Sequence, residues 1–135
     1  MAITAFHQLV WIDHRSAKVF GVSRHSLIEL AVIQAPNEGK GHIHHKAGTM
    51  GAGHNSPSAR FLEQVATALR DAREILIIGP SDAKHALKDH LKRHEPILGE
   101  RVIGVEAMDK CGEEQLQAYA SLFFRQADSM HPPPS

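Results

Sequence analysis

The chain lacks both the features that stabilise small secreted proteins and those that anchor a protein in a membrane. Among its 135 residues there is one cysteine, so no internal disulfide can form and a reducing compartment suits the chain best. No stretch approaches the roughly 20 apolar residues that a membrane-spanning helix requires. Residues 1–6 lack the basic start and the long apolar run of an export signal. These absences predict a cytoplasmic protein that does not contact a membrane.

The formal net charge is zero, because 15 Lys and Arg balance 15 Asp and Glu. The charges are unevenly spread: residues 1–60 hold six Lys and Arg against three acidic residues, together with seven of the eleven histidines. An anionic partner would therefore meet the first half of the chain. Asymmetries of this size also occur in proteins that bind no anion, so the charge distribution alone leaves both interpretations open.

The apolar pattern predicts a single domain over residues 1–128 and a disordered tail over 129–135. Apolar runs typical of strands fall at 9–12, 17–22, 27–33, 75–78 and 101–106. The spacing of apolar residues also predicts three helices. The first follows a cap at Ser56 or Ser58, the second runs from a cap at Ser81 to Pro96, and the third begins at Glu113.

These elements follow the order β-β-β-α-β-α-β-α. Three strands joined by short links favour an antiparallel meander. Helical crossovers between the later strands require parallel pairing and right-handed connections. The sequence therefore predicts an α/β fold, a mixed five-stranded sheet with packed helices, similar in plan to a ribonuclease-H-like fold.

A long segment rich in glycine and histidine, residues 40–57, separates the third strand from the first helix. Connections longer than about 12–15 residues without structure of their own are usually functional or disordered. Lysines and arginines can contact phosphates, imidazoles can stack on bases, and glycines let a backbone approach closely. The candidate RNA-binding residues are Lys40, His42, His44, His45, Lys46, Gly51, Gly53, His54 and Arg60. A surface loop without a ligand could have the same composition.

The same histidines offer an alternative, a metal-dependent hydrolase. In an extended backbone His42 and His44 point to one side, and His45, His54 or Asp13 could complete a transition-metal site. A structural zinc site usually includes cysteine, and Cys111 lies far away in the sequence. No metal or other cofactor is therefore predicted, and His42, His44 and His54 remain the metal candidates.

Two further chemistries have weaker support. A two-metal nuclease needs clustered carboxylates, and the strands supply Asp13, Glu29 and Glu106 without a second acidic pair nearby. Residues 79–84, Gly-Pro-Ser-Asp-Ala-Lys, could cradle a phosphate at a helix start, but they are much shorter than a Walker motif. A tight turn from strand to helix explains this segment.

Three segments resemble a known group of proteins. Residues 11–15, 42–48 and 75–84 are similar to small bacterial proteins labelled translational machinery protein, which are related to the middle domain of eukaryotic and archaeal class I release factors and of Pelota. The resemblance extends from Val10 to Phe124. It implies the release-factor middle-domain fold and contact with the ribosome, through ribosomal or transfer RNA.

The sequence departs from the release factors at their catalytic tripeptide. Those factors carry Gly-Gly-Gln before the first long helix, whereas residues 51–55 read Gly-Ala-Gly-His-Asn. Gln64 lies inside the predicted helix and cannot replace the missing glutamine. The resemblance therefore implies a ribosome- or RNA-associated protein that is not a peptide-release enzyme. A homodimeric interaction module remains a further alternative.

Overall fold

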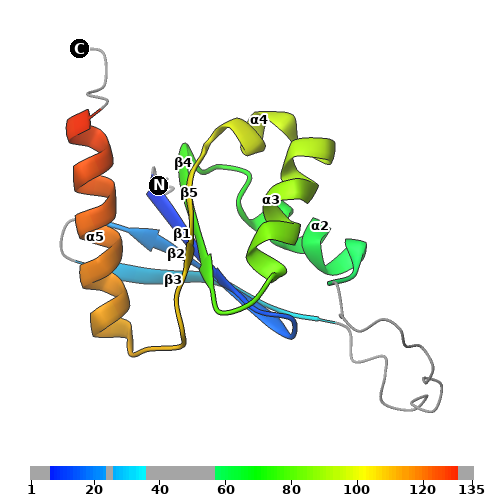
Figure 1. Ribbon diagram of the computed structural model, residues 1–135, viewed down its shortest axis with the longest axis horizontal. Helices are drawn as coiled ribbons and strands as arrows, with labels where there is room; N and C mark the ends of the chain where they lie inside the picture. The colour runs from blue at the N-terminus through cyan, green and yellow to red at the C-terminus, as the bar shows by residue number, and fades with distance from the viewer. Residues whose placement is uncertain (1–6, 24–25, 36–56, 131–135) are drawn as a thin grey trace.

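The structure is a computed structural model that describes residues 7–23, 26–35 and 57–130 (Figure 1). Its elements are β1 (His7–Ile12), β2 (Ser16–Val22), β3 (Leu27–Gln34), α2 (Ala59–Ala68), β4 (Glu74–Gly79), α3 (Ala83–His94), α4 (Pro96–Glu100), β5 (Val102–Ala107) and α5 (Glu113–Met130). Every predicted strand is present, with ends that differ by no more than two residues from the prediction. Among the described residues, no helix combines the length and the apolarity needed to cross a membrane.

The five strands form one mixed sheet in the order β3-β2-β1-β4-β5. β2 is antiparallel to both β1 and β3, whereas β4 is parallel to both β1 and β5. The predicted meander and the predicted parallel crossovers are both confirmed, and so is the fold class. Because β2 alone runs in the opposite direction, β1, β3, β4 and β5 all end at one edge of the sheet, which we call the carboxyl edge.

Helices cover both faces of the sheet (Figure 1). On the α2–α3 side, Val10, Ile75 and Ile77 join the core that includes Phe61 and Leu87. The other face is the α5 side. The buried residues of its core are Leu9, Phe20, Val22, Leu76, Ile78, Leu116, Ala120 and Phe124. The unbroken apolar run of β4 is thus explained by burial on both faces.

The helix starts test the predicted caps. Ser58 caps α2, since its Oγ accepts a hydrogen bond of 3.1 Å from the backbone N of Phe61. The other candidate, Ser56, lies outside the described residues. The cap predicted at Ser81 was wrong: the N-cap position of α3 is Asp82, which makes no side-chain cap bond. Ser81 Oγ accepts only a long bond, 3.4 Å, from the N of Ala83.

Two helix ends differ from the prediction. α3 ends at His94, but Pro96 begins a further short helix, α4, instead of closing the region. Proline suits the first helical position because its missing N–H would have no partner there. α5 continues through Met130, two residues into the segment predicted as a tail.

Gly79 ends β4 in close contact with β1. A Cβ atom added to Gly79 would overlap the carbonyl oxygen of Ile12. This oxygen belongs to the backbone of the neighbouring strand, and a backbone cannot move aside as a flexible side chain can. Glycine is thus required here for close packing, since no described glycine has a positive φ.

We expect Gly79→Ala to lower the free energy of unfolding by about 1–3 kcal/mol, because overpacking forces backbone shifts. Urea unfolding followed by the fluorescence of the single tryptophan, Trp11, measures the change. Gly112→Ala is the matched control, since a Cβ at Gly112 meets nothing within 4 Å. Equal stability of the two variants would contradict this account of Gly79.

Candidate functional site

Most of the predicted site lies outside the described residues. This holds for Lys40, His42, His44, His45, Lys46, Gly51, Gly53 and His54, and therefore for all three metal candidates. Arg60 is described, and so are Ala35, which follows β3 five residues before the segment, and Pro57, the last residue of the segment. The elements that hold Ala35 and Pro57 form the described part of the site.

The end of β3 is fastened to the β1–β2 turn at the carboxyl edge. The backbone N of Ala35 donates a 2.7 Å hydrogen bond to the carbonyl of Arg15. Asp13 Oδ1 accepts bonds from the backbone N of Arg15, at 2.8 Å, and of Ser16, at 2.9 Å. Asp13 is thus a turn residue, and its side chain stabilises the β1–β2 turn. The side chain of Arg15 is exposed, and its backbone holds Ala35, the last described residue before the segment.

The other end enters α2. Behind the Ser58 cap, Phe61 is fully buried and Val65 lies one turn further along the same face, which fixes the helix on the sheet. Arg60 is exposed in the first turn of α2. Arg60 thus follows the candidate segment by three residues, whereas Arg15 is distant in sequence and is joined to Ala35 through its backbone carbonyl.

The β4–α3 turn contributes a buried cation to the same edge. Lys84 is 7% exposed, and its Nζ donates a 2.7 Å hydrogen bond to the carbonyl of Ser81. The lysine thereby closes the turn that follows β4. This geometry agrees with the interpretation of residues 79–84 as a tight strand-to-helix turn.

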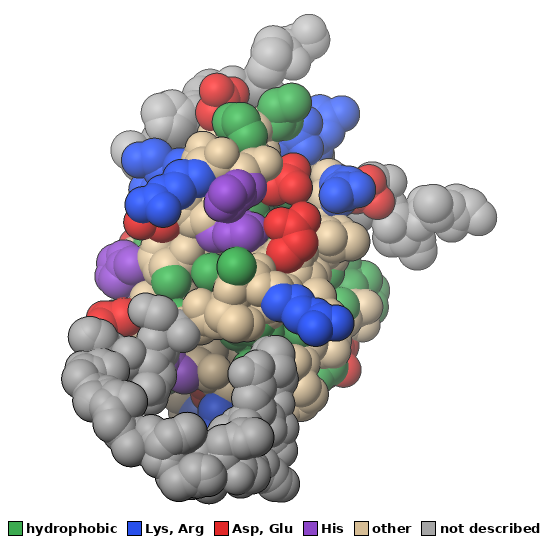
Figure 2. Space-filling view, turned by 90° about the vertical axis from the view of Figure 1, so that its right-hand side faces the viewer, with side chains coloured by type: hydrophobic (Ala, Val, Ile, Leu, Met, Phe, Trp, Pro, Cys, Tyr) green, Lys and Arg blue, Asp and Glu red, His purple; other side chains and the backbone are tan. Residues whose placement is uncertain are grey.

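A histidine pair on α3 forms a contact that the sequence did not reveal. His90 is 8% exposed, its Nε2 lies 3.1 Å from Glu63 Oε1 of α2, and its ring centroid is 4.7 Å from that of His94. Figure 2 shows this side of the molecule, where histidine side chains gather beside acidic ones. His90 and His94 are one turn apart on α3, whereas Glu63 is 27 residues from His90. The contact ties α2 to α3.

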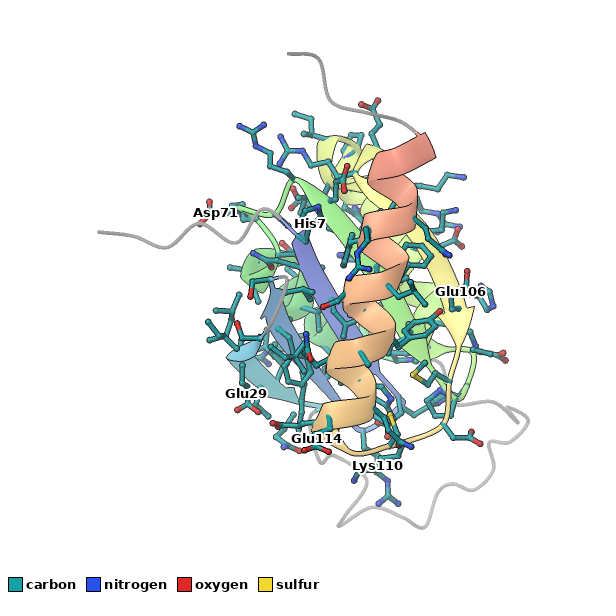
Figure 3. The ribbon with its side chains drawn as sticks, turned by 90° about the vertical axis from the view of Figure 1, so that its left-hand side faces the viewer. His7, Glu29, Asp71, Glu106, Lys110 and Glu114 are labelled. Carbon is teal, nitrogen blue, oxygen red and sulfur yellow. The ribbon has the colours of Figure 1, made fainter. Side chains whose placement is uncertain are left out.

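The three carboxylates considered for a nuclease do not come together. Glu29 lies on β3 and Glu106 on β5, the two edge strands, so they are four inter-strand spacings apart, roughly 19 Å. Figure 3 shows them on opposite sides of α5. Asp13 accepts two backbone bonds within its turn. In the described part of the chain, no group of three or more His, Cys, Asp or Glu side chains could hold a metal.

Comparison with known proteins finds similarity in structure only. No family model and no curated protein matches the sequence. Archaeoglobus fulgidus Pelota matches with a TM-score of 0.63 and 15% identity, over 92% of this chain and 34% of that one. Thermoplasma acidophilum Pelota matches with a TM-score of 0.57 and 19% identity, over 91% and 33%.

A third match is to Saccharomyces cerevisiae Dom34, described as a translation termination-like factor involved in RNA quality control pathways and interacting with Hbs1. Its TM-score is 0.55 and its identity 11%, over 92% of this chain and 37% of that one. The chain thus spans about a third of the length of these proteins. At such low identity the matches show the fold: this chain has the α/β fold of the middle domain of Pelota, as the resemblance implied.

Tyr119, on α5, shows the clearest electrostatic perturbation among the described residues. Burial raises the pKa of its phenol above the ordinary value, and the negative charge of Glu106 adds a smaller effect in the same direction. Both causes disfavour the phenolate. The folded state therefore holds this proton to a higher pH than the unfolded chain does.

We expect Glu106→Gln to lower the pKa of Tyr119 only part of the way, because burial is the larger cause. The stability linked to this proton is complete below about pH 10 and is lost as the pH rises through the folded-state pKa. The chain has one tyrosine, so an ultraviolet titration reports this group alone. Glu29→Gln, on the opposite edge strand, should leave the pKa unchanged. A Tyr119 pKa at the ordinary value that does not change in Glu106→Gln would contradict both the burial of the phenol and the effect of Glu106.

Proposed function

We propose that this chain is a translation-factor-like protein that associates with the ribosome and contacts RNA through residues 40–57, without peptide-release chemistry. The observation that carries the proposal is the position of the segment within a Pelota-like fold. It leaves β3 at the carboxyl edge and returns at the first helix. Ligands of open α/β sheets bind outside the carboxyl ends of the strands.

The described residues on either side of the segment are held firmly, which suits a segment that must be presented to a large partner. Ala35 is bonded to the β1–β2 turn, and α2 is capped and packed by its apolar face. We infer that residues 1–128 act as one domain, in which the sheet and its helices form the rigid mount. Segments placed on a rigid scaffold commonly carry the binding residues of a protein.

The residues proposed to contact RNA are chemically suited to phosphates and bases. Lys40, Lys46 and Arg60 would contact phosphate oxygens, and Arg15 is a further exposed cation at the same edge. The imidazoles of His42 and His44 would stack on bases or contact phosphates, according to their charge. No residue of this set has the amide that glutamine supplies in the release factors, so activation of water on peptidyl-tRNA is not part of the proposal.

Sedimentation of cell extract tests ribosome association directly. We expect the chain to travel with ribosomal particles at low salt, and Lys40→Glu/Lys46→Glu to weaken binding to purified ribosomes at least about tenfold, because phosphate contacts dominate such affinities. Arg70→Glu/Arg73→Glu is the matched control: both arginines are exposed and lie just before β4, away from the carboxyl edge. Recovery of the wild-type chain only in the soluble fraction would refute the proposal.

The histidines should make binding depend on pH. Between about pH 6 and pH 8 their side chains lose positive charge, so the affinity for RNA should fall as the pH rises. Filter binding with purified ribosomal RNA across this range measures the effect. His42→Gln/His44→Gln/His45→Gln should bind more weakly at the acidic end and respond less to pH. An affinity that stays flat across the range in the wild-type chain would exclude a role for these histidines.

A further inference from the structure

The β4–α3 turn, residues 79–84, contains a buried cation whose charge is not balanced by any described residue. Lys84 is 7% exposed, and its Nζ makes one hydrogen bond, to the carbonyl of Ser81. A lysine ammonium has three N–H donors, so two of them lack a partner in the described part of the chain. None of the described carboxylates forms an ion pair with Lys84. Buried charges are normally paired with an opposite charge, and here the protein supplies only a neutral carbonyl.

The start of α3 leaves backbone N–H groups open beside this cation. Asp82, at the N-cap position of this twelve-residue helix, makes no side-chain cap bond. The N of Ala83 makes only the long bond of 3.4 Å to Ser81 Oγ. The N of Lys84 has no hydrogen-bond partner among the described residues. Open N–H groups at a helix start attract anions, because the positive end of the helix dipole adds to their effect.

The side chain of Lys84 brings its charge to these N–H groups. Its Nζ bonds the carbonyl of a residue three positions earlier, so the side chain runs back towards the start of α3. Ser81 adds a part-buried hydroxyl, which accepts the bond from Ala83 and keeps its own hydrogen for donation. The turn thus gathers an ammonium, a hydroxyl and the backbone N–H groups of Ala83 and Lys84. All of these groups donate hydrogen bonds.

The turn also lies where the connections of the sheet diverge. β1 and β4 are neighbours, and the chain continues from β1 to β2 on one side and from β4 through α3 to β5 on the other (Figure 1). Ligands of open α/β sheets bind at such a point, outside the carboxyl ends of the strands. The turn is held in place as well, since the carbonyl of Gly79 accepts a 3.0 Å hydrogen bond from the N of Met108. Its donors are therefore already positioned before a ligand arrives.

We propose that the β4–α3 turn binds a phosphate group through Lys84 Nζ, Ser81 Oγ and the backbone N–H groups of Ala83 and Lys84. Phosphate oxygens accept several hydrogen bonds at once and carry the negative charge that the buried ammonium lacks. The turn is closed by one donor of that ammonium, so its structural role leaves the others for the ligand. None of these groups belongs to residues 40–57, so the proposal goes beyond the RNA contact proposed above. A phosphodiester of RNA and a small phosphate ester both offer this chemistry.

The experiment is a titration of the full chain with inorganic phosphate at constant ionic strength, followed by amide NMR. We expect the signals of Ala83 and Lys84 to shift and to saturate. Lys84→Met removes the ammonium and should raise the dissociation constant at least about tenfold. Lys88→Met, one turn further along the same helix, is the matched control and should leave the dissociation constant unchanged. Urea unfolding of each variant verifies the fold.

Asp82→Asn tests the same site without removing a donor. Asp82 is the one acidic residue of the turn, and its negative charge opposes an anion. Asparagine suits the N-cap position as well as aspartate does, so the variant should fold normally. We expect it to bind inorganic phosphate about threefold more tightly than the wild-type chain. Weaker binding by this variant would contradict the proposed position of the phosphate.

Two further probes distinguish the sources of the phosphate: a short RNA without terminal phosphates, and glycerol phosphate. If the RNA shifts the Ala83 and Lys84 signals at the lower concentration, the site belongs to an RNA interface. The reverse order assigns a small phosphate ester. Signals that move with none of the three probes, or shifts that Lys84→Met leaves unchanged, would overturn the proposal. Failure of the chain to sediment with ribosomes would refute the proposed function and leave the result with inorganic phosphate unaffected.

Discussion

The structure depends on one constraint: the two central strands, β1 and β4, are apolar on both faces. Leu9, Val10, Leu76 and Ile77 are all fully buried, although successive residues point to opposite sides. Neither face of the sheet can therefore be exposed to water. One face takes α2 and α3, and the other takes α5. Once both faces are covered, the ends and the edges of the sheet are the surfaces left for binding.

The fold could be predicted from the sequence because its signals are local. The unbroken apolar run at Ile75–Ile78 indicated a strand, and the helical spacing after Ser58 indicated α2. The side-by-side arrangement of the strands followed from short links and helical crossovers, which physical rules restrict to few topologies. The position of the candidate segment, between β3 and α2, followed from the same reasoning.

What could not be predicted depends on contacts distant in sequence. The partner of His90 is Glu63, which belongs to another helix, and no spacing rule connects the two. The burial of Lys84 results from how its turn packs. The bulge at Leu30 is equally invisible, because Leu27–Gln34 reads as a plain apolar strand and the register shift arises only from its pairing with β2. The candidate segment itself was found by composition, which is why its chemistry rests on residue types.

The position of β1 also dictates the order in which the domain can assemble during synthesis. β1 pairs with β2 a few residues later, but its other edge must wait for β4, with His7 opposite Glu74. The meander of β1, β2 and β3 therefore emerges from the ribosome with one apolar edge unpaired while the next 40 residues or so are translated. Parallel pairing over such a separation is intrinsically slow. The sheet can be completed only after β4 has been translated, and until then the unpaired side of β1 is of the kind that favours aggregation.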